Sequence, residues 1–229
     1  MLRLMTVPGI DATVALSIVA AVGDFTRFRT PDKLVAYLGL NPRVRQSGGQ
    51  PASHGRITKA GSAHARGMLV EAAWSASKAA GPLRAFYQRV QARRGMQIAV
   101  VATARKLAVL CWHLIISGED YAYAQPSLVA HKRRKLELRA GLPSARGQKG
   151  KSAGYSLQAV RAAERDLATQ AEVAYRVTIA AWQPTRPTGR PAGTAATRRA
   201  GAGRSGVDVA ATTGARLSRP SRGNAARQG

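Results

Sequence analysis

A serine lies within a cationic segment of the sequence, where it could act on a phosphate group. Residues 37–61 read YLGLNPRVRQSGGQPASHGRITKAG, and Ser47 is followed by Gly48 and Gly49. A hydroxyl that attacks phosphorus needs close approach, which glycines permit, and positive charge to stabilise the transition state. No acidic residue occurs from Lys33 to Val70. The cations that can supply the charge are Arg43, Arg45, Arg56, Lys59 and Arg66.

Ser47 is therefore a candidate nucleophile, and we expect these cations, together with Gly48, to contact nucleic acid. The spacing alone leaves the role of Ser47 open, because Ser-Gly-Gly is also an ordinary flexible turn. Ser53 and His54 offer a second hydroxyl and a base in the same segment, and nothing local ranks them.

A second candidate is the turn that begins TVPGIDATVALS at residue 6. It resembles the second half of a helix-hairpin-helix, in which backbone N–H groups at a helix N-terminus bind a DNA phosphate, so Gly9 is a candidate contact. Asp11 departs from that motif, because its carboxylate would cap the helix and repel phosphate. The alternative is a tight turn that packs two helices. Only residues 1–6 precede the turn, which is too few for the hairpin's first helix.

A metal site is not expected in this chain. His54, His64, His113 and His131 show no ligand spacing with one another or with Cys111. The carboxylates are few and scattered along the sequence.

The charge of the chain indicates a polyanionic partner. The formal net charge is +25 over 229 residues, and the pI is about 11.7. A basic helix is predicted over residues 131–141, HKRRKLELRAG, and we expect Lys132, Arg133 and Arg134 to face nucleic acid. Its two leucines do not share a helix face, which argues against a membrane surface.

Cysteine use and hydropathy indicate a cytoplasmic protein. Cys111 is the one cysteine and lies in an apolar run, so we expect a buried, reduced thiol. No apolar stretch is expected to reach the ~18 residues that a membrane span needs, so we expect no span, and we expect no signal peptide.

The elements that must position these residues are predicted to be helices. Apolar residues recur at helical spacing, and Asp11 and Ser62 stand where side chains cap helix N-termini. No alternating pattern indicates a strand or hairpin. The predicted helices span residues 11–22, 30–39, 62–80, 83–94, 97–117, 131–141 and 155–182.

The fold class is thus expected to be mainly α, in three parts. Residues 1–125 form a helical domain with a helix-hairpin-helix-like start and the Ser47 loop. Residues 126–182 form a basic helical extension, with a linker at 142–155 and then a long helix. Residues 183–229 are rich in Arg, Gly, Ala, Pro and Thr, and are expected to be disordered because they bury too little apolar surface.

Several motifs together resemble the C-terminal transposase domain of the insertion-sequence 116/110/902 transposases, which move DNA with a bridging guide RNA. The resemblance is specific over about residues 5–80 and looser to about residue 182. The motifs that carry it are VPGI, VGDFTRF, YLGLNP at 37–42, Ser47-Gly48, GRITKAG at 55–61 and Arg66.

The resemblance implies that Ser47 attacks a DNA phosphodiester and is held as a covalent phosphoserine. It also implies an N-terminal RuvC-like domain whose acidic residues bind Mg²⁺ beside that serine. These 229 residues do not match that domain, so the chain is expected to be a truncated copy that binds no cofactor alone and is inactive without the domain. The expected partners are DNA, a guide RNA, a RuvC-like domain encoded upstream or supplied in trans, and further copies of the chain.

Two other interpretations remain open at this point. The chain can be a non-catalytic module that binds nucleic acid through its basic segments. It can also be an inactive remnant without a selected role.

Overall fold

The structure, a computed structural model, describes residues 1–47, 52–143 and 157–182, and the side chain of His54 is not described. The predictions for Gly48, for most of the linker at 142–155 and for the tail at 183–229 lie outside the described residues. The described residues all belong to one compact unit.

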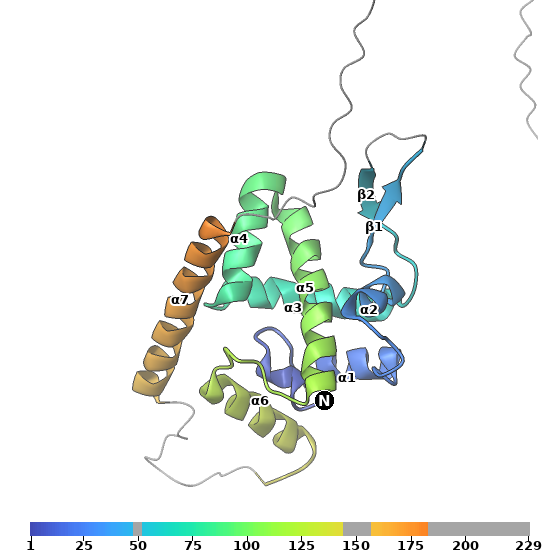
Figure 1. Ribbon diagram of the computed structural model, residues 1–229. Coiled ribbons are helices and arrows are strands. Elements are labelled where there is room, and N and C mark those ends of the chain that lie inside the picture. Colours follow the sequence, from blue (N-terminus) through green and yellow to red (C-terminus); the bar gives the residue numbers. More distant parts are fainter. Residues whose placement is uncertain (48–51, 144–156, 183–229) are drawn as a thin grey trace, which may run out of the picture. The chain divides into compact units, whose positions relative to one another are not determined.

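The described residues confirm the mainly α fold (Figure 1). A short 3₁₀ helix and a two-stranded hairpin accompany the α-helices. In chain order the elements are η1 (Leu4–Thr6), α1 (Ala12–Val22), α2 (Pro31–Tyr37), β1 (Pro42–Arg45), β2 (Ser53–Ile57), α3 (Ala63–Lys78), α4 (Pro82–Arg94), α5 (Met96–Ser117), α6 (Pro126–Arg139) and α7 (Gln158–Ala181).

Side-chain caps begin two of these helices where the sequence indicated. The carboxylate of Asp11 accepts a hydrogen bond from the Val14 amide at 2.9 Å, and the hydroxyl of Ser62 accepts one from the Ala65 amide at 3.2 Å. Each bond satisfies an amide that has no partner within its own helix. At α2 the first turn contains Pro31, whose fixed φ suits that position.

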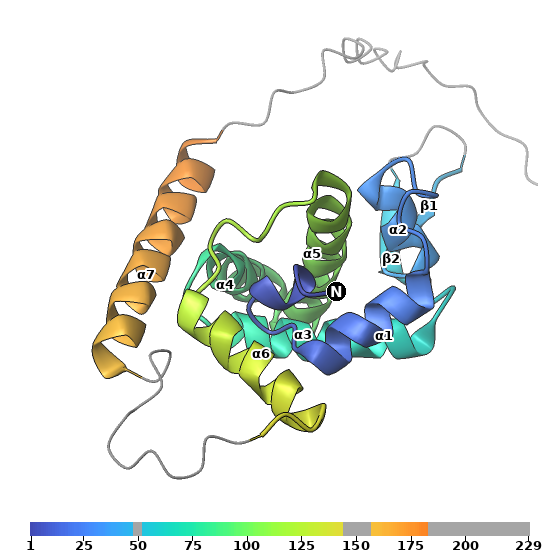
Figure 2. The same ribbon diagram turned by 90° about the horizontal axis from the view of Figure 1, so that it is seen from below.

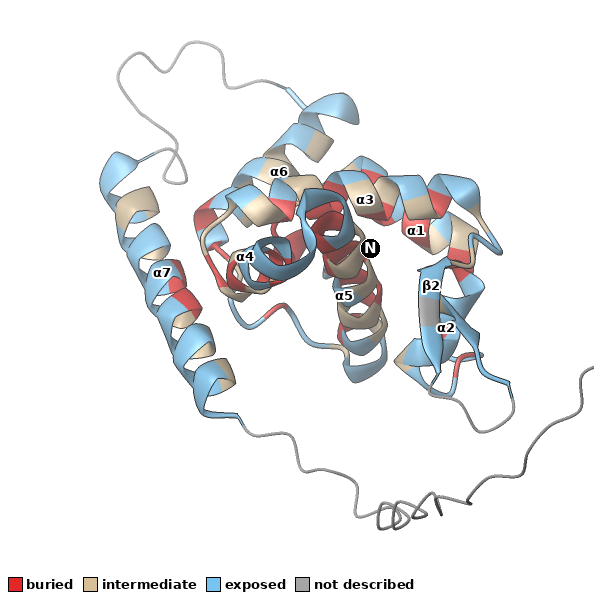
Figure 3. Ribbon diagram, turned by 90° about the horizontal axis from the view of Figure 1, so that it is seen from above, coloured by how far each residue is buried: buried red, intermediate tan, exposed pale blue. Residues whose placement is uncertain are grey.

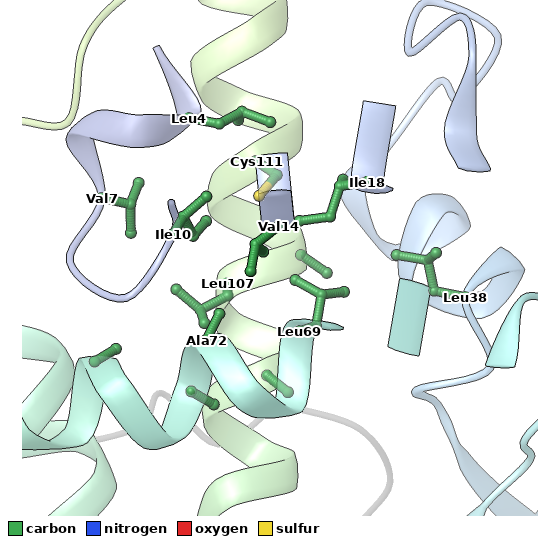
Figure 4. Packing of buried hydrophobic residues seen from close by; sticks show 14 of the residues in the cluster. Leu4, Val7, Ile10, Val14, Ile18, Leu38, Leu69, Ala72, Leu107 and Cys111 are labelled. Carbon is green, nitrogen blue, oxygen red and sulfur yellow. The ribbon is translucent and has the colours of Figure 1, made fainter. Parts of the chain in front are cut away.

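Helix α5 lies at the centre of the core and contacts α2, α3 and α4. Figure 4 shows Leu107 and Cys111 of α5 beside Leu69 of α3 and Val14 of α1. Burial raises the pKa of the Cys111 thiol to about 12, because a thiolate would lose its hydration. The prediction of a buried, free thiol is confirmed.

The length and composition of α5 correct one expectation from the sequence. This helix has 22 residues and contains an 18-residue window with a mean hydropathy of 1.6, so by length and composition it is long and apolar enough to cross a membrane. In the described fold it is instead the central core helix, with buried residues from Ala99 to Leu114 packed against its neighbours.

The hairpin β1–β2 is a second correction, since no strand was predicted (Figure 3). Its side chains are mostly exposed, so neither strand has the alternation of buried and exposed residues that marks a strand in sequence. The backbone pairing is nevertheless antiparallel, with Val44 opposite His54 and Arg45 opposite Ser53.

The last two described helices also differ from the prediction. Helix α6 begins at Pro126, five residues before the basic run, and proline at its first turn accounts for the start. Helix α7 contacts α4 and α6, and lies beside α4 in Figures 1 and 2. Its buried residues are Ala168 and Glu172, whereas Leu167 is 65% exposed.

Candidate nucleic-acid interface

The hairpin holds most of the predicted contact residues in a short, irregular ribbon. Pro42 pairs with Ile57 and Val44 pairs with His54, so Gly55 and Arg56 together lie opposite Arg43. This extra residue on β2 is a β-bulge, which bends a strand and redirects its side chains. A Cβ atom at Gly55 would lie 3.6 Å from the carbonyl oxygen of Arg43, which is an ordinary van der Waals contact, so a small side chain would fit there.

Two glycines fix the base of the hairpin. Gly39 (φ +70°) and Gly61 (φ +94°) lie where a Cβ atom would be 2.0 Å from the Ala60 carbonyl oxygen and 1.9 Å from the Tyr37 carbonyl oxygen. Only glycine fits both the backbone conformation and this approach. Backbone hydrogen bonds from Thr58 to Asn41 (2.8 Å) and from Lys59 to Gly39 (3.1 Å) complete the base, which the sequence analysis did not identify.

Lys59 and Arg66 occupy special positions at this base. Lys59 has φ +58°, a left-handed conformation that costs a residue other than glycine roughly 1–2 kcal/mol. Arg66, in the first turns of α3, donates from its guanidinium to the Leu38 carbonyl at 3.2 Å. Arg66 therefore ties α3 to the end of α2, while the ammonium of the exposed Lys59 stays at the surface.

Ser47 is exposed and lies two residues beyond the end of β1. Arg43 and Arg45 precede it on the strand at positions that share one face, and both are exposed. Arg56 of the bulge is exposed as well. The hairpin thus brings Ser47 and these arginines onto one ribbon.

The charge of this ribbon is not neutralised by the fold. Among the described residues, Arg43, Arg45, Arg56 and Lys59 form no ion pair with a carboxylate. The segment from residue 33 to residue 70 contains no acid, so the ribbon offers only positive charge. Such a surface attracts phosphate groups by long-range electrostatics.

Gly9 and Lys132 lie at the N-terminal turn, and the structure gives both a packing role. A Cβ atom at Gly9 (φ +90°) would lie 2.3 Å from the Ala72 carbonyl oxygen, so this turn packs closely on α3. Lys132 donates from Nζ to the carbonyl oxygens of Met5 (2.7 Å) and Val7 (2.9 Å). Burial lowers its pKa to about 8, and the nearby Asp11 carboxylate opposes this shift.

The neighbouring cations of α6 differ in their surroundings. Arg133 is exposed. Arg134 pairs with Glu137 at 3.1 Å, three residues along the helix, and donates to the Pro143 carbonyl at 2.8 Å.

Carboxylates do not gather near Ser47. In the described part of the chain, no group of three or more His, Cys, Asp or Glu side chains is placed to hold a metal ion. The hairpin residues themselves therefore do not fit a magnesium site, which requires oxygen ligands.

These features define a class of protein, a basic helical domain that presents a hydroxyl and unpaired arginines on a β-ribbon. Residues 1–88 match the model of the Transposase IS116/IS110/IS902 family. The described hairpin and α3, which carry the motifs of residues 37–66, lie within this match.

Two curated transposases are similar over about half of the chain. The transposase for insertion sequence element IS1111A of Coxiella burnetii is 34% identical over 127 residues, 52% of this chain and 34% of that protein. A Pseudomonas aeruginosa protein named "Probable family 20 transposase" is 35% identical over 118 residues, 49% of this chain and 34% of that protein. This chain spans about a third of the length of these relatives. The matches support the transposase family.

Proposed function

We propose that this chain contributes the serine of a DNA transposase, with Ser47 as the nucleophile for strand cleavage and exchange. The observation that carries the proposal is the exposure of Ser47 on a ribbon whose arginines have no carboxylate partner among the described residues. The family match over residues 1–88 includes this ribbon.

The chemical step is a transesterification at a DNA phosphodiester. A bond forms between Ser47 Oγ and phosphorus while the bond from phosphorus to one deoxyribose oxygen breaks. The hydroxyl proton passes to a base, and the departing oxygen takes up a proton. The energy of the cleaved ester is kept in the serine phosphodiester, so a second DNA hydroxyl can reverse the step on another strand.

The residues of the ribbon have separate parts in this step. Arg43, Arg45 and Arg56 stabilise the charge that develops on the phosphoryl oxygens. A neutral serine hydroxyl is a weak nucleophile until a base takes its proton, and the described residues of the ribbon provide no group of carboxylates to hold a metal ion. We therefore propose that this chain cleaves DNA only with a separate acidic, RuvC-like domain, and that a guide RNA and further copies of the chain complete the assembly.

The test compares two serines of the same hairpin. The chain is combined with a RuvC-like domain of a relative, guide RNA, DNA and Mg²⁺, and the protease-sensitive protein–DNA adduct is measured on a denaturing gel. Ser47→Ala should abolish the adduct. Ser53→Ala, which removes an exposed hydroxyl opposite Arg45, should retain it. An adduct that survives in the first variant and disappears in the second would move the nucleophile to Ser53.

A second candidate function is nucleic-acid binding without cleavage, and the unpaired arginines favour it equally. The logarithm of the binding constant for duplex DNA should then fall with the logarithm of salt concentration, by about 0.9 for each phosphate neutralised. The control is the complete protein of a relative, which should form a protein–DNA adduct under the same conditions. If this chain binds DNA there but forms no adduct, its function is binding without cleavage.

A further inference from the structure

A cavity of about 490 Å³ lies at the opposite end of α3 from the hairpin. It is formed where the last turn of α3 meets the starts of α4, α6 and α7. Helix α3 has 16 residues and is therefore about 24 Å long. The cavity and the hairpin are thus separate features joined by one helix.

Cations surround this cavity. Its lining includes Lys78, Arg84, Arg161 and Arg165. Lys78 is exposed in the last turn of α3. Arg165 uses its Nε for the Arg161 carbonyl at 3.2 Å, which leaves its two terminal amino groups available in the described structure.

The acidic residues next to the cavity are already engaged. Glu172 accepts hydrogen bonds from the Gly81 amide and from Arg84. Glu164 binds the amide and hydroxyl of Ser127 at the start of α6. These contacts satisfy the helix N-termini and leave an excess of positive charge on the cavity lining.

Gln125 gives the cavity a polar group that the fold does not use. This residue is only 8% exposed and lines the cavity, yet its side-chain amide has no hydrogen-bond partner among the described residues. The amide atoms are not themselves fully buried, so water in the cavity reaches them, and a ligand that replaces this water can use both the donor and the acceptor. Beside it, Leu128 and Ala79 provide apolar surface.

We propose that this cavity binds one unpaired nucleotide of a nucleic-acid strand. The base lies on the apolar surface and exchanges hydrogen bonds with the Gln125 amide, and the phosphate is neutralised by Lys78 and Arg165. An amide that both donates and accepts matches the edge of a base, whereas inorganic phosphate would use only the cations. The inference rests on the proposed function for its choice of a nucleic-acid partner.

The test uses the whole chain and two variants of the cavity. Gln125→Leu removes the amide at similar size, and Lys78→Gln removes one exposed cation. Arg93→Gln is the matched control, because Arg93 is also an exposed cation in the last turn of a helix but does not line the cavity. Affinities for a labelled single-stranded DNA of about ten nucleotides, within the usual site size, and for the same sequence as a duplex are measured at one salt concentration.

Gln125→Leu should weaken single-strand binding about five- to ten-fold, as expected for a lost hydrogen-bonding group, and change duplex binding little. Lys78→Gln should weaken single-strand binding more than Arg93→Gln does. Circular dichroism checks the fold of each variant. If Gln125→Leu does not fold, the comparison of Lys78→Gln with Arg93→Gln decides the question. Single-strand affinities equal to the parent in the folded cavity variants would overturn the proposal.

A second probe separates this proposal from the proposed function. A mixture of nucleoside monophosphates, and inorganic phosphate alone, are tested for binding by equilibrium dialysis. Nucleotide binding that Gln125→Leu weakens supports the cavity even if the chain forms no DNA adduct. Equal binding of inorganic phosphate and nucleotides, or binding of neither, would refute a nucleotide site while leaving the role of Ser47 intact.

Discussion

Replacing Glu172 by glutamine tests how α7 is held on the fold. The Glu172 side chain is 4% exposed and accepts hydrogen bonds from the Gly81 amide (3.2 Å), Arg84 Nε (2.7 Å) and Arg176 Nη2 (2.5 Å). Glutamine keeps the size and one acceptor oxygen but removes the charge. Few apolar side chains of α7 are buried, so this cluster carries much of the docking.

Glu172→Gln should lower the free energy of docking α7 by about 2 kcal/mol. Hydrogen bonds to a charged group contribute ~1.5–3 kcal/mol, and breaking a fully buried ion pair costs more. The lower figure applies because the Arg84 and Arg176 side chains are 29% and 55% exposed, so water screens them. If α7 opens locally, its amides should exchange about thirty-fold faster than in the parent, whereas those of α5 should be unaffected.

The effect should depend on pH with a defined sign. Burial alone would raise the pKa of Glu172, but the hydrogen bonds from Arg84, Gly81 and Arg176 outweigh it and hold the pKa below its ordinary value. The stabilisation is therefore complete above the unfolded-state pKa of about 4.3 and is lost as the pH falls through the lower pKa of the folded state. The difference in stability between the parent and Glu172→Gln should therefore have its full value at neutral pH and should disappear in acid.

The assay is hydrogen exchange followed by mass spectrometry at neutral pH. Glu137→Gln is the matched control, because it removes an exposed carboxylate paired with Arg134 three residues away and should change stability by about 0.3 kcal/mol. If the amides of α7 exchange at the parent's rate in Glu172→Gln, the Glu172 carboxylate does not hold α7 on the fold.

Three further predictions concern the hairpin base and the core. Gly61→Ala should lower the free energy of unfolding by more than about 2 kcal/mol, because its Cβ atom would lie 1.9 Å from a carbonyl oxygen. Gly67→Ala has open space in α3 and should raise the free energy of unfolding by about 0.5–1 kcal/mol. Urea denaturation measures both changes. Lys59→Gly should raise stability by about 1 kcal/mol by relieving the left-handed backbone, and an unchanged or lower urea midpoint would contradict this. Cys111 should resist alkylation by iodoacetamide until the protein unfolds, since burial raises the pKa of its thiol to about 12; rapid labelling of the folded chain would show that α5 is not packed as described.

Local signals in the sequence predicted the helices well. Asp11 and Ser62 were identified as caps because a short acceptor at a helix N-terminus acts on amides only three residues away. The apolar run around Cys111 likewise predicted that this thiol is buried in α5. These features depend on neighbours in the chain, which the sequence displays directly.

The hairpin and the docking of α7 depend on residues far apart in the chain. The strands have little buried surface, so their pairing leaves no periodic pattern, and the base is fixed by contacts of Gly39 and Gly61 across the hairpin. In α7 the apolar spacing predicted a helix over residues 155–182 but did not show which face would pack. Glu172 reaches Gly81, 91 residues earlier, and its face of the helix is turned to the fold.

The candidate site was predicted in part. The segment around Ser47 was identified from its charge, and the structure places Ser47 and its arginines on one exposed ribbon. The contact of Gly9 and Lys132 with nucleic acid stays a prediction, and the structure adds a packing role for each: Gly9 lies close against α3, and Lys132 binds backbone carbonyls. Sequence reveals the charge of a lysine but not the carbonyl groups that the fold brings to it.

The central claim is that Ser47 Oγ forms the bond to DNA, and peptide mapping of the protein–DNA adduct tests it most directly. The adduct is digested with protease and nuclease, and tandem mass spectrometry locates the residue that carries the remaining nucleotide. The nucleotide mass should lie on Ser47, in a peptide that also contains the ribbon around it. A nucleotide on any other residue, Ser53 included, would contradict the account.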